Sequence, residues 1–145
     1  MAVWKLSLER IVEEEGPEAE ADPTAEATIK ATWIYLGRHR SHWRPITALE
    51  FGLRDDGRQT LVSVGEDRCL VEYDLDESSV GTGVVLKEPP KRIEVSAVPT
   101  AATWHPLLGT GANRDYEDRI VTANSEYKLM QWNADNKSCR RTTLG

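Results

Sequence analysis

The sequence predicts an all-β fold built from short antiparallel strands that recur along the chain. Three observations support this: brief β-prone runs alternate with turn sequences, one segment is repeated without gaps, and helical periodicity is almost absent. Only residues 4–15 show a weak helical pattern. With 145 residues, the chain is long enough for one domain of ordinary size.

The N-terminal part combines a strand-like run with an acidic segment. Residues 2–6 match residues 71–75 in their aromatic and Leu positions, so we expect a strand within residues 1–11. Residues 12–28 have almost no large apolar side chains and cannot offset the cost of ordering. The stretch from Glu9 to Glu26 contains eight acids and one base and so carries a net charge of −7. Because the whole chain carries −6, the remaining residues sum to +1. We interpret it as a flexible insertion that is either solvated or docks a basic partner.

The middle of the chain reads as an antiparallel meander. Residues 29–37 contain the β-prone run Thr32 to Leu36, and turn signals at residues 55–57 and 65–68 divide the following segment into short strands. These three strands are Ile46 to Phe51, Thr60 to Val64 and Cys69 to Asp74. After a loop rich in Gly and Pro, we expect residues 92–95 to add a fourth strand.

An internal repeat divides the chain. Residues 61–74 align without gaps with residues 120–133 at a constant offset of 59, and residues 47–51 align with residues 100–104 at an offset of 53. The difference falls in a loop, where insertions are tolerated. We expect residues 140–144 to close the second copy.

At individual positions the repeat resembles the WD-repeat family, in which the third of four strands ends in Trp-Asp. The corresponding pairs are Trp4-Lys5, Tyr73-Asp74 and Trp132-Asn133. The resemblance implies a partial β-propeller of about two and a half four-stranded antiparallel blades, fewer than the roughly four to eight that close a ring. Its terminal sheets would expose apolar faces, as uncapped repeats do.

The resemblance also implies a buried hydrogen-bond network in the central blade, formed by His42, Ser63, Asp67 and Tyr73. Trp4 and Trp132 would be the aromatic residues of the flanking blades. We expect the network to be broken in the last blade, which has Glu126 in the turn and no His before its first strand.

These observations predict five segments along the chain. They are a third strand of a first partial blade (1–11), an acidic flexible insertion (12–28), the closing strand of the first blade (29–37), a complete central blade (38–96) and a further blade (97–145).

The sequence offers no set of residues for catalysis or metal binding. His39 and His42 lie among arginines, His105 is expected in an exposed loop, and Ser63 has no base beside it in sequence. The glycines at 109 and 111 lack the Lys-Ser/Thr ending of a phosphate loop. We therefore predict no enzyme activity, no cofactor and no metal. An enzyme remains the third hypothesis, to be reopened by a pocket holding His105 and acidic residues.

A basic and aromatic stretch at residues 38–44 is the strongest candidate for a partner contact. Arg and Trp are favoured as interface anchors. The same composition can bind nucleic acid, and solvent-facing arginines of a loop are the simplest interpretation. The near-neutral main body lacks the broad basic face of a nucleic-acid binder, and no apolar run reaches the roughly 18 residues of a membrane helix. The candidate contacts, expected on one rim, are Arg38, Arg40, Trp43, Arg44, Arg68 and Tyr127.

Three segments narrow the resemblance: residues 33–46, residues 61–75, and residues 96–106 with their Trp104-His105-Pro106. They resemble the ciliary WD-repeat family of cilia- and flagella-associated protein 251. The resemblance implies a non-catalytic scaffold of the motile-cilium axoneme, in the calmodulin- and spoke-associated complex at the base of radial spoke 3. Its partners would be other axonemal and radial spoke proteins in a large assembly that includes calmodulin. The alternative is a general cytosolic WD-repeat adaptor in another complex.

Overall fold

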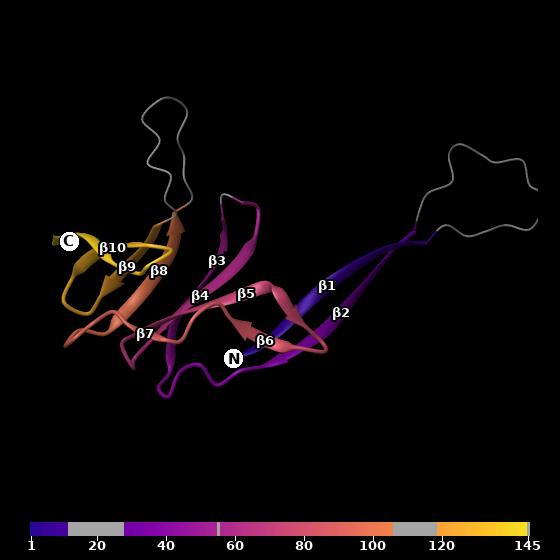
Figure 1. Cartoon of the computed structure of the whole chain (residues 1–145), viewed down its shortest axis with the longest axis horizontal. Helices are drawn as coiled ribbons and strands as arrows, with labels where there is room; N and C mark the ends of the chain where they lie inside the picture. The colour runs from indigo at the N-terminus through magenta and orange to yellow at the C-terminus, as the bar shows by residue number, and fades with distance from the viewer. Residues whose placement is uncertain (12–27, 55, 106–118, 145) are drawn as a thin grey trace, which may run out of the picture.

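A computed structural model describes residues 1–11, 28–54, 56–105 and 119–144. This part of the chain forms strands joined by turns and loops (Figure 1). The strands are β1 (Ala2–Ile11), β2 (Thr28–Arg38), β3 (Ile46–Leu53), β4 (Gln59–Gly65), β5 (Cys69–Ser79), β6 (Gly83–Leu86), β7 (Lys91–Arg92), β8 (Pro99–His105), β9 (Arg119–Asn124), β10 (Lys128–Asn133) and β11 (Cys139–Leu144). The predicted acidic insertion lies outside the described residues, except for Thr28, which begins β2.

The strands form three antiparallel sheets, which confirms the predicted all-β class. β1 and β2 make a two-stranded ribbon, and β8, β9, β10 and β11 make a four-stranded sheet in sequence order. Between them lies the central sheet, in which β3, β4, β5 and β6 are neighbours and β7 also pairs with β5. In the residues that the structure describes, no helix is long and apolar enough to span a membrane.

The sequence repeat is also a repeat of backbone geometry. Ser63 pairs with Val71 across β4 and β5, and Thr122 pairs with Met130 across β9 and β10, each 59 residues later. The two hairpin turns match as well, because Arg68 and Tyr127 both have positive φ, at 66° and 60°. Their amides donate to the carbonyls of Gly65 and Asn124, at 2.9 and 3.1 Å. The turns therefore share one conformation despite different residues.

The predicted fourth strand of the central sheet is only partly correct. Residues 92–95 were expected to close the sheet, and of these Arg92, in β7, pairs with Cys69. The rest of the closing edge comes from Lys91, which pairs with Leu70, and from β6, where Leu86 pairs with Tyr73. The prolines at 89 and 90 separate the two short strands because they lack an amide to donate to β5. After β7, Ile93 turns into the core and the chain leaves the sheet. The closing edge is therefore split in two.

Within the central sheet, β4 and the first part of β5 are buried on both faces, whereas β3 is partly exposed. Alternate residues of β4 belong to different cores, since successive side chains of a strand point to opposite faces. Val62 and Val64 pack toward the four-stranded C-terminal sheet, in a cluster with Ile120 and Trp132. Leu61 packs on the other side, in a cluster that Val3, Leu75 and Leu86 of the neighbouring strands complete. This two-sided packing explains why β4 is buried at every position after Gln59.

One close contact joins the central sheet to β8. The indole of Trp104 lies against the backbone of Gly52, where a Cβ atom would come within 2.4 Å of the ring. The indole Nε1 donates to the Leu53 carbonyl at 3.1 Å. Glycine is therefore required at this position by the approach of the ring.

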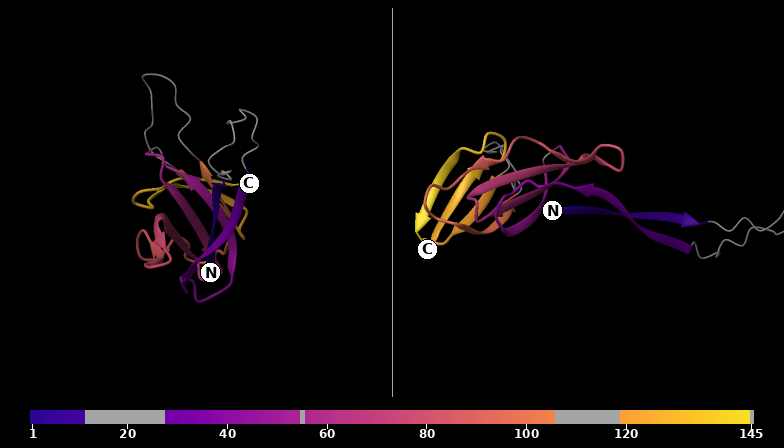
Figure 2. Two further views of the ribbon diagram at one scale, coloured as in Figure 1. Left: turned by 90° about the vertical axis from the view of Figure 1, so that its right-hand side faces the viewer. Right: turned by 90° about the horizontal axis from the view of Figure 1, so that it is seen from below.

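The β1–β2 ribbon leaves a large apolar surface exposed. Directly paired residues share a face of the ribbon, and on one face these are Trp4 with Tyr35, and Leu6 with Trp33. Leu8 and Ile29 extend the same face, and all six side chains have exposed fractions between 42% and 66%. Figures 1 and 2 show the ribbon projecting away from the C-terminal sheet. We call this face the apolar ribbon face.

We expect Gly52→Ala to lower the free energy of unfolding by about 1–3 kcal/mol, because the new methyl group overpacks against Trp104. Urea denaturation followed by tryptophan fluorescence measures the change. Gly81→Ala is the matched control, since its Cβ would meet only the Ser79 hydroxyl, at 3.9 Å. Equal stability of the two variants would contradict the proposed packing constraint.

Candidate interaction surface and its supporting network

The predicted contact stretch forms the loop from the end of β2 to the start of β3. Exposed and buried residues alternate along it: Arg40 and Arg44 are exposed, and Ser41 and His42 between them are buried. Trp43 is 63% exposed. The loop therefore presents arginine and tryptophan side chains outward while its centre is anchored inside.

A chain of hydrogen bonds anchors the loop. His42 Nδ1 donates to the two carboxylate oxygens of Asp67, at 2.9 and 3.0 Å, and His42 Nε2 lies 2.7 Å from Ser63 Oγ. Ser63 Oγ lies 3.1 Å from the Tyr73 hydroxyl, which also bonds to Ser41 Oγ. The structure thus brings together the four residues that the sequence grouped and adds Ser41, which sequence comparison missed.

Asp67 ties this network to the backbone on both sides. Its carboxylate accepts from the amides of Trp43 and Cys69, at 3.1 and 3.2 Å. Gly65 allows the imidazole to approach, because a Cβ there would lie 2.9 Å from His42 Nδ1. The loop and the β4–β5 turn are therefore held as one unit.

The geometry of Ser63, His42 and Asp67 matches a Ser-His-Asp catalytic arrangement in its hydrogen bonds. Its environment differs, because Ser63 has no exposed surface and its oxygen is also engaged by Tyr73. A nucleophile must reach a substrate carbonyl, and this hydroxyl is enclosed by protein. The arrangement is thus suited to fixing a loop and not to attacking a substrate.

The C-terminal sheet uses other residues at the equivalent positions. Trp132 Nε1 donates to Thr122 Oγ1 at 2.9 Å, and Asn124 donates to Glu94 Oε1 at 2.8 Å. Asn124 also accepts from the amides of Glu126 and Lys128, at 3.0 Å each. These bonds form two separate pairs, Trp132 with Thr122 and Asn124 with Glu94, and none of them links the pairs as His42 links Ser63 to Asp67. Asn124 aligns with Gly65, so the alignment did not predict its role in the turn.

Trp4 differs from Trp132. It is 56% exposed and tilts against Tyr35, with ring centroids 4.9 Å apart, on the apolar ribbon face. Trp132 is buried between the sheets.

The loops at this end of the sheets form one continuous row, which we call the loop rim. It comprises residues 39–45, 65–68, 93–98 and 124–127. Hydrogen bonds link its members: Glu66 N donates to Pro45 O, Arg68 Nη1 to Val95 O, and Ser125 N to Val98 O, at 2.9, 2.6 and 2.8 Å. Tyr127 is 83% exposed on its far turn. Five of the six predicted contact residues thus lie in the loop rim, and Arg38 ends β2 next to it. Arg68 is already engaged by a carbonyl.

Sequence reasoning missed a buried charge cluster. Glu72 of β5 has no exposed surface, and Lys137 of the β10–β11 turn is 2% exposed. Lys137 Nζ lies 2.5 Å from Glu72 Oε2, while Arg54 and Thr60 bond to Glu72 Oε1. Arg54 also bonds to Asp135 at 2.8 Å. Charges from the central sheet and the C-terminal sheet therefore meet inside the protein.

Opposite charges keep this cluster ionised. Burial by itself would raise the pKa of Glu72, but Lys137 and Arg54 outweigh it and hold that pKa below its usual range. Burial by itself would lower the pKa of Arg54, but Glu72 and Asp135 raise it. The Arg54 guanidinium also lies over the Trp104 ring, 5.3 Å from its centroid. The cluster thus joins the two sheets electrostatically. In the sequence, the sign of this charge cluster is Glu72, a charged residue within the apolar run that begins β5.

His105 is the last residue of β8, and its side chain is exposed, as the sequence predicted. Within the described residues, no group of three or more His, Cys, Asp or Glu side chains is arranged to hold a metal ion.

Comparison with known proteins identifies relatives of one kind. The chain is 38% identical to mouse cilia- and flagella-associated protein 251 over 114 residues, and 37% identical to the Pongo abelii protein of that name over 114 residues. This chain is homologous to cilia- and flagella-associated protein 251. The Chlamydomonas reinhardtii protein of that name is 31% identical over 114 residues. The resemblance expected from the sequence is thereby confirmed.

The matches cover most of the chain and little of the relatives. They include 76% to 78% of this chain, but the chain spans only 8% to 14% of the length of cilia- and flagella-associated protein 251 in the three species. No family model matches the chain.

We expect Glu72→Gln to lower the free energy of unfolding by about 3 kcal/mol, since it removes the buried carboxylate shared by Lys137 and Arg54. Lys137 then keeps the partly exposed Glu88, at 2.9 Å, as its ion-pair partner. Because Glu72 has a lowered pKa in the folded state, its stabilisation is complete above about pH 4.3 and is lost as the pH falls through the folded pKa. Denaturation across this range should show a weaker acid dependence in Glu72→Gln. The exposed Glu77→Gln is the control, and equal stability of the two variants at neutral pH would refute the cluster's role.

We also expect Ser63 to resist a fluorophosphonate, which labels serine nucleophiles, because the hydroxyl is enclosed. Mass spectrometry of the treated native protein measures the adduct, and a serine hydrolase in the same tube shows that the reagent is active. Labelling at Ser63 in the folded protein would favour the enzyme hypothesis.

Proposed function

We propose that this chain is part of a non-catalytic β-propeller scaffold in the motile-cilium axoneme. The observation that carries the proposal is its homology to cilia- and flagella-associated protein 251. The scaffold resembles a subunit at the base of radial spoke 3 that docks other spoke proteins, in a complex containing calmodulin, and helps to regulate dynein-driven motility. The loop rim is the proposed docking edge.

Repeated sheet packing supports the propeller part of the proposal. The central sheet contacts one neighbour on each face, and its hairpin turn recurs in the next sheet. We propose the same segments as blades: a third strand in residues 1–11, a closing strand in 29–37, a complete blade in 38–96 and a further blade in 97–145. The acidic insertion between the first two segments is a loop of the first blade in this proposal.

The apolar ribbon face supports the assembly part. Six exposed large side chains on one face are typical of a surface that a partner covers. β1 is also paired on one edge only, with β2, in the described part of the chain. In the proposed propeller, a neighbouring blade covers this face, and the second strand of the same blade pairs with that edge.

A general cytosolic WD-repeat adaptor is the second candidate. The hydrogen-bond network and loop rim suit any protein-docking scaffold, because nothing in their chemistry is particular to cilia. The location of the protein separates the two candidates.

The test is to tag the protein that contains this chain in a flagellated cell and fractionate the cell. We expect the tagged protein to stay with axonemes after detergent removes the membrane, and to co-purify with radial spoke proteins after salt extraction. A soluble protein that remains in the cytoplasm and co-purifies with other complexes would instead establish the adaptor. An untagged strain controls for carry-over.

A further inference from the structure

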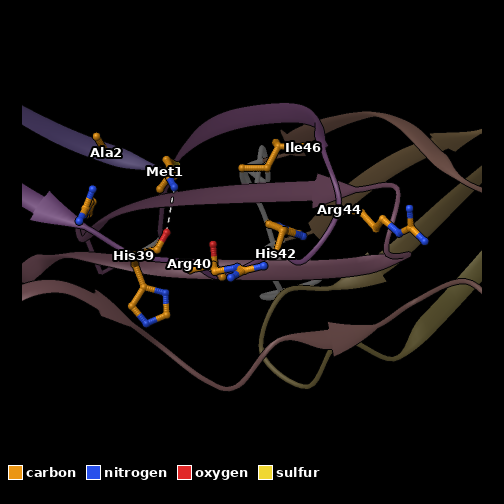
Figure 3. Close-up of a pocket in the computed structure, with 9 residues that line it drawn as sticks. Met1, Ala2, His39, Arg40, His42, Arg44 and Ile46 are labelled. Carbon is orange, nitrogen blue, oxygen red and sulfur yellow. Dashed lines mark hydrogen bonds between the residues drawn. The ribbon is translucent and has the colours of Figure 1, made fainter.

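A basic cavity opens at the β1 end of the loop rim. It has a volume of about 730 Å³, within the range of roughly 300–1,000 Å³ typical of ligand pockets. Its lining combines three arginines with small and apolar residues and contains no Asp or Glu. The lining residues are Met1, Ala2, Arg38, His39, Arg40, Ser41, His42, Arg44 and Ile46. Figure 3 shows Arg40 between His39 and His42, with Arg44 at the end of the row away from Ala2.

The three arginines lack counter-charges. Within the described residues, none of Arg38, Arg40 and Arg44 forms an ion pair or a side-chain hydrogen bond. Acidic partners are plentiful in this chain, which has 24 acidic residues and a net charge of −6, and other arginines do have partners. Arg54 pairs with Glu72 and Asp135, and other arginines donate to backbone carbonyls. The guanidinium groups at this cavity are thus free to bind an external anion.

The backbone that carries the arginines is fixed before any ligand arrives. His39 N donates to the Met1 carbonyl at 2.9 Å, and the buried Ser41 and His42 belong to the hydrogen-bond network. Trp43 N is held by Asp67. A loop that is already ordered loses less entropy on binding, so the arginines gain affinity from their anchored neighbours.

We infer that this cavity binds an acidic segment of a partner protein, with carboxylates paired to Arg40 and Arg44. The inference rests on the proposed function, in which the loop rim docks other proteins, and adds the chemistry of one partner. Planar guanidinium groups bind carboxylates through two parallel hydrogen bonds. Ile46 in the wall and the exposed Trp43 beside it provide apolar contacts for the same peptide.

Nucleic acid fits the site less well. A nucleic-acid binder presents a broad basic face to a long backbone, whereas here the positive charge is confined to one loop of an acidic protein. A short peptide with several adjacent carboxylates matches both the size of the cavity and its charge.

Fluorescence anisotropy with a labelled hexaglutamate peptide and the full 145-residue chain tests the inference. The variant Arg40→Gln/Arg44→Gln should weaken binding by at least about tenfold. The control Lys5→Gln/Arg58→Gln removes the same charge from exposed sites elsewhere and should change binding by less than about twofold. Circular dichroism checks that both variants keep the β fold.

Several results would overturn the inference: equal losses in the two double variants, equal binding of a hexaglutamine peptide, or stronger binding of an oligothymidylate or inorganic phosphate than of hexaglutamate. The axonemal fractionation of the unaltered protein separates the two proposals. If that protein reaches the axoneme but the unaltered chain fails to bind hexaglutamate, only this inference is refuted. If the unaltered protein is absent from the axoneme, the proposed function is refuted, whatever the peptide does.

Discussion

Burial of β4 and the first part of β5 on both faces constrains the rest of this structure. β4 and β5 send alternate side chains into two separate cores, so neither face can hold an unsatisfied polar group without a cost of several kcal/mol. Yet this sheet contains Ser63, Glu72 and Tyr73, all with no exposed surface. Each therefore requires partners supplied by loops and by the neighbouring sheet.

The two ends of the central sheet meet this requirement in different ways. At the loop rim, His42 bonds to Ser63, and Ser63 and Ser41 bond to Tyr73. Asp67 holds His42, and the same contacts order the loop that displays the arginines. At the opposite end, Arg54 and Lys137 neutralise Glu72 and connect two sheets. One end thus prepares a surface for a partner, and the other fastens the sheets that support it.

The ribbon shows what happens where two-sided burial is incomplete. Its Val3 side packs on the central sheet, whereas the apolar ribbon face meets solvent. A scaffold that works inside an assembly can keep such a face because its partner supplies the missing cover.

The sequence by itself determined the strands and the repeat, because alternation, turn residues and spacing are local signals. It also marked the arginine loop and the family resemblance, and that resemblance implied the grouping of His42, Ser63, Asp67 and Tyr73. Only the tertiary structure decided which distant polar residues pair, as Asn124 and Glu94 do, and which charges meet, as Glu72 and Lys137 do across 65 positions. It also decided the split of the closing strand into β6 and β7. These outcomes depend on packing between sheets, and no local pattern records which side chain a neighbouring sheet will bring into contact.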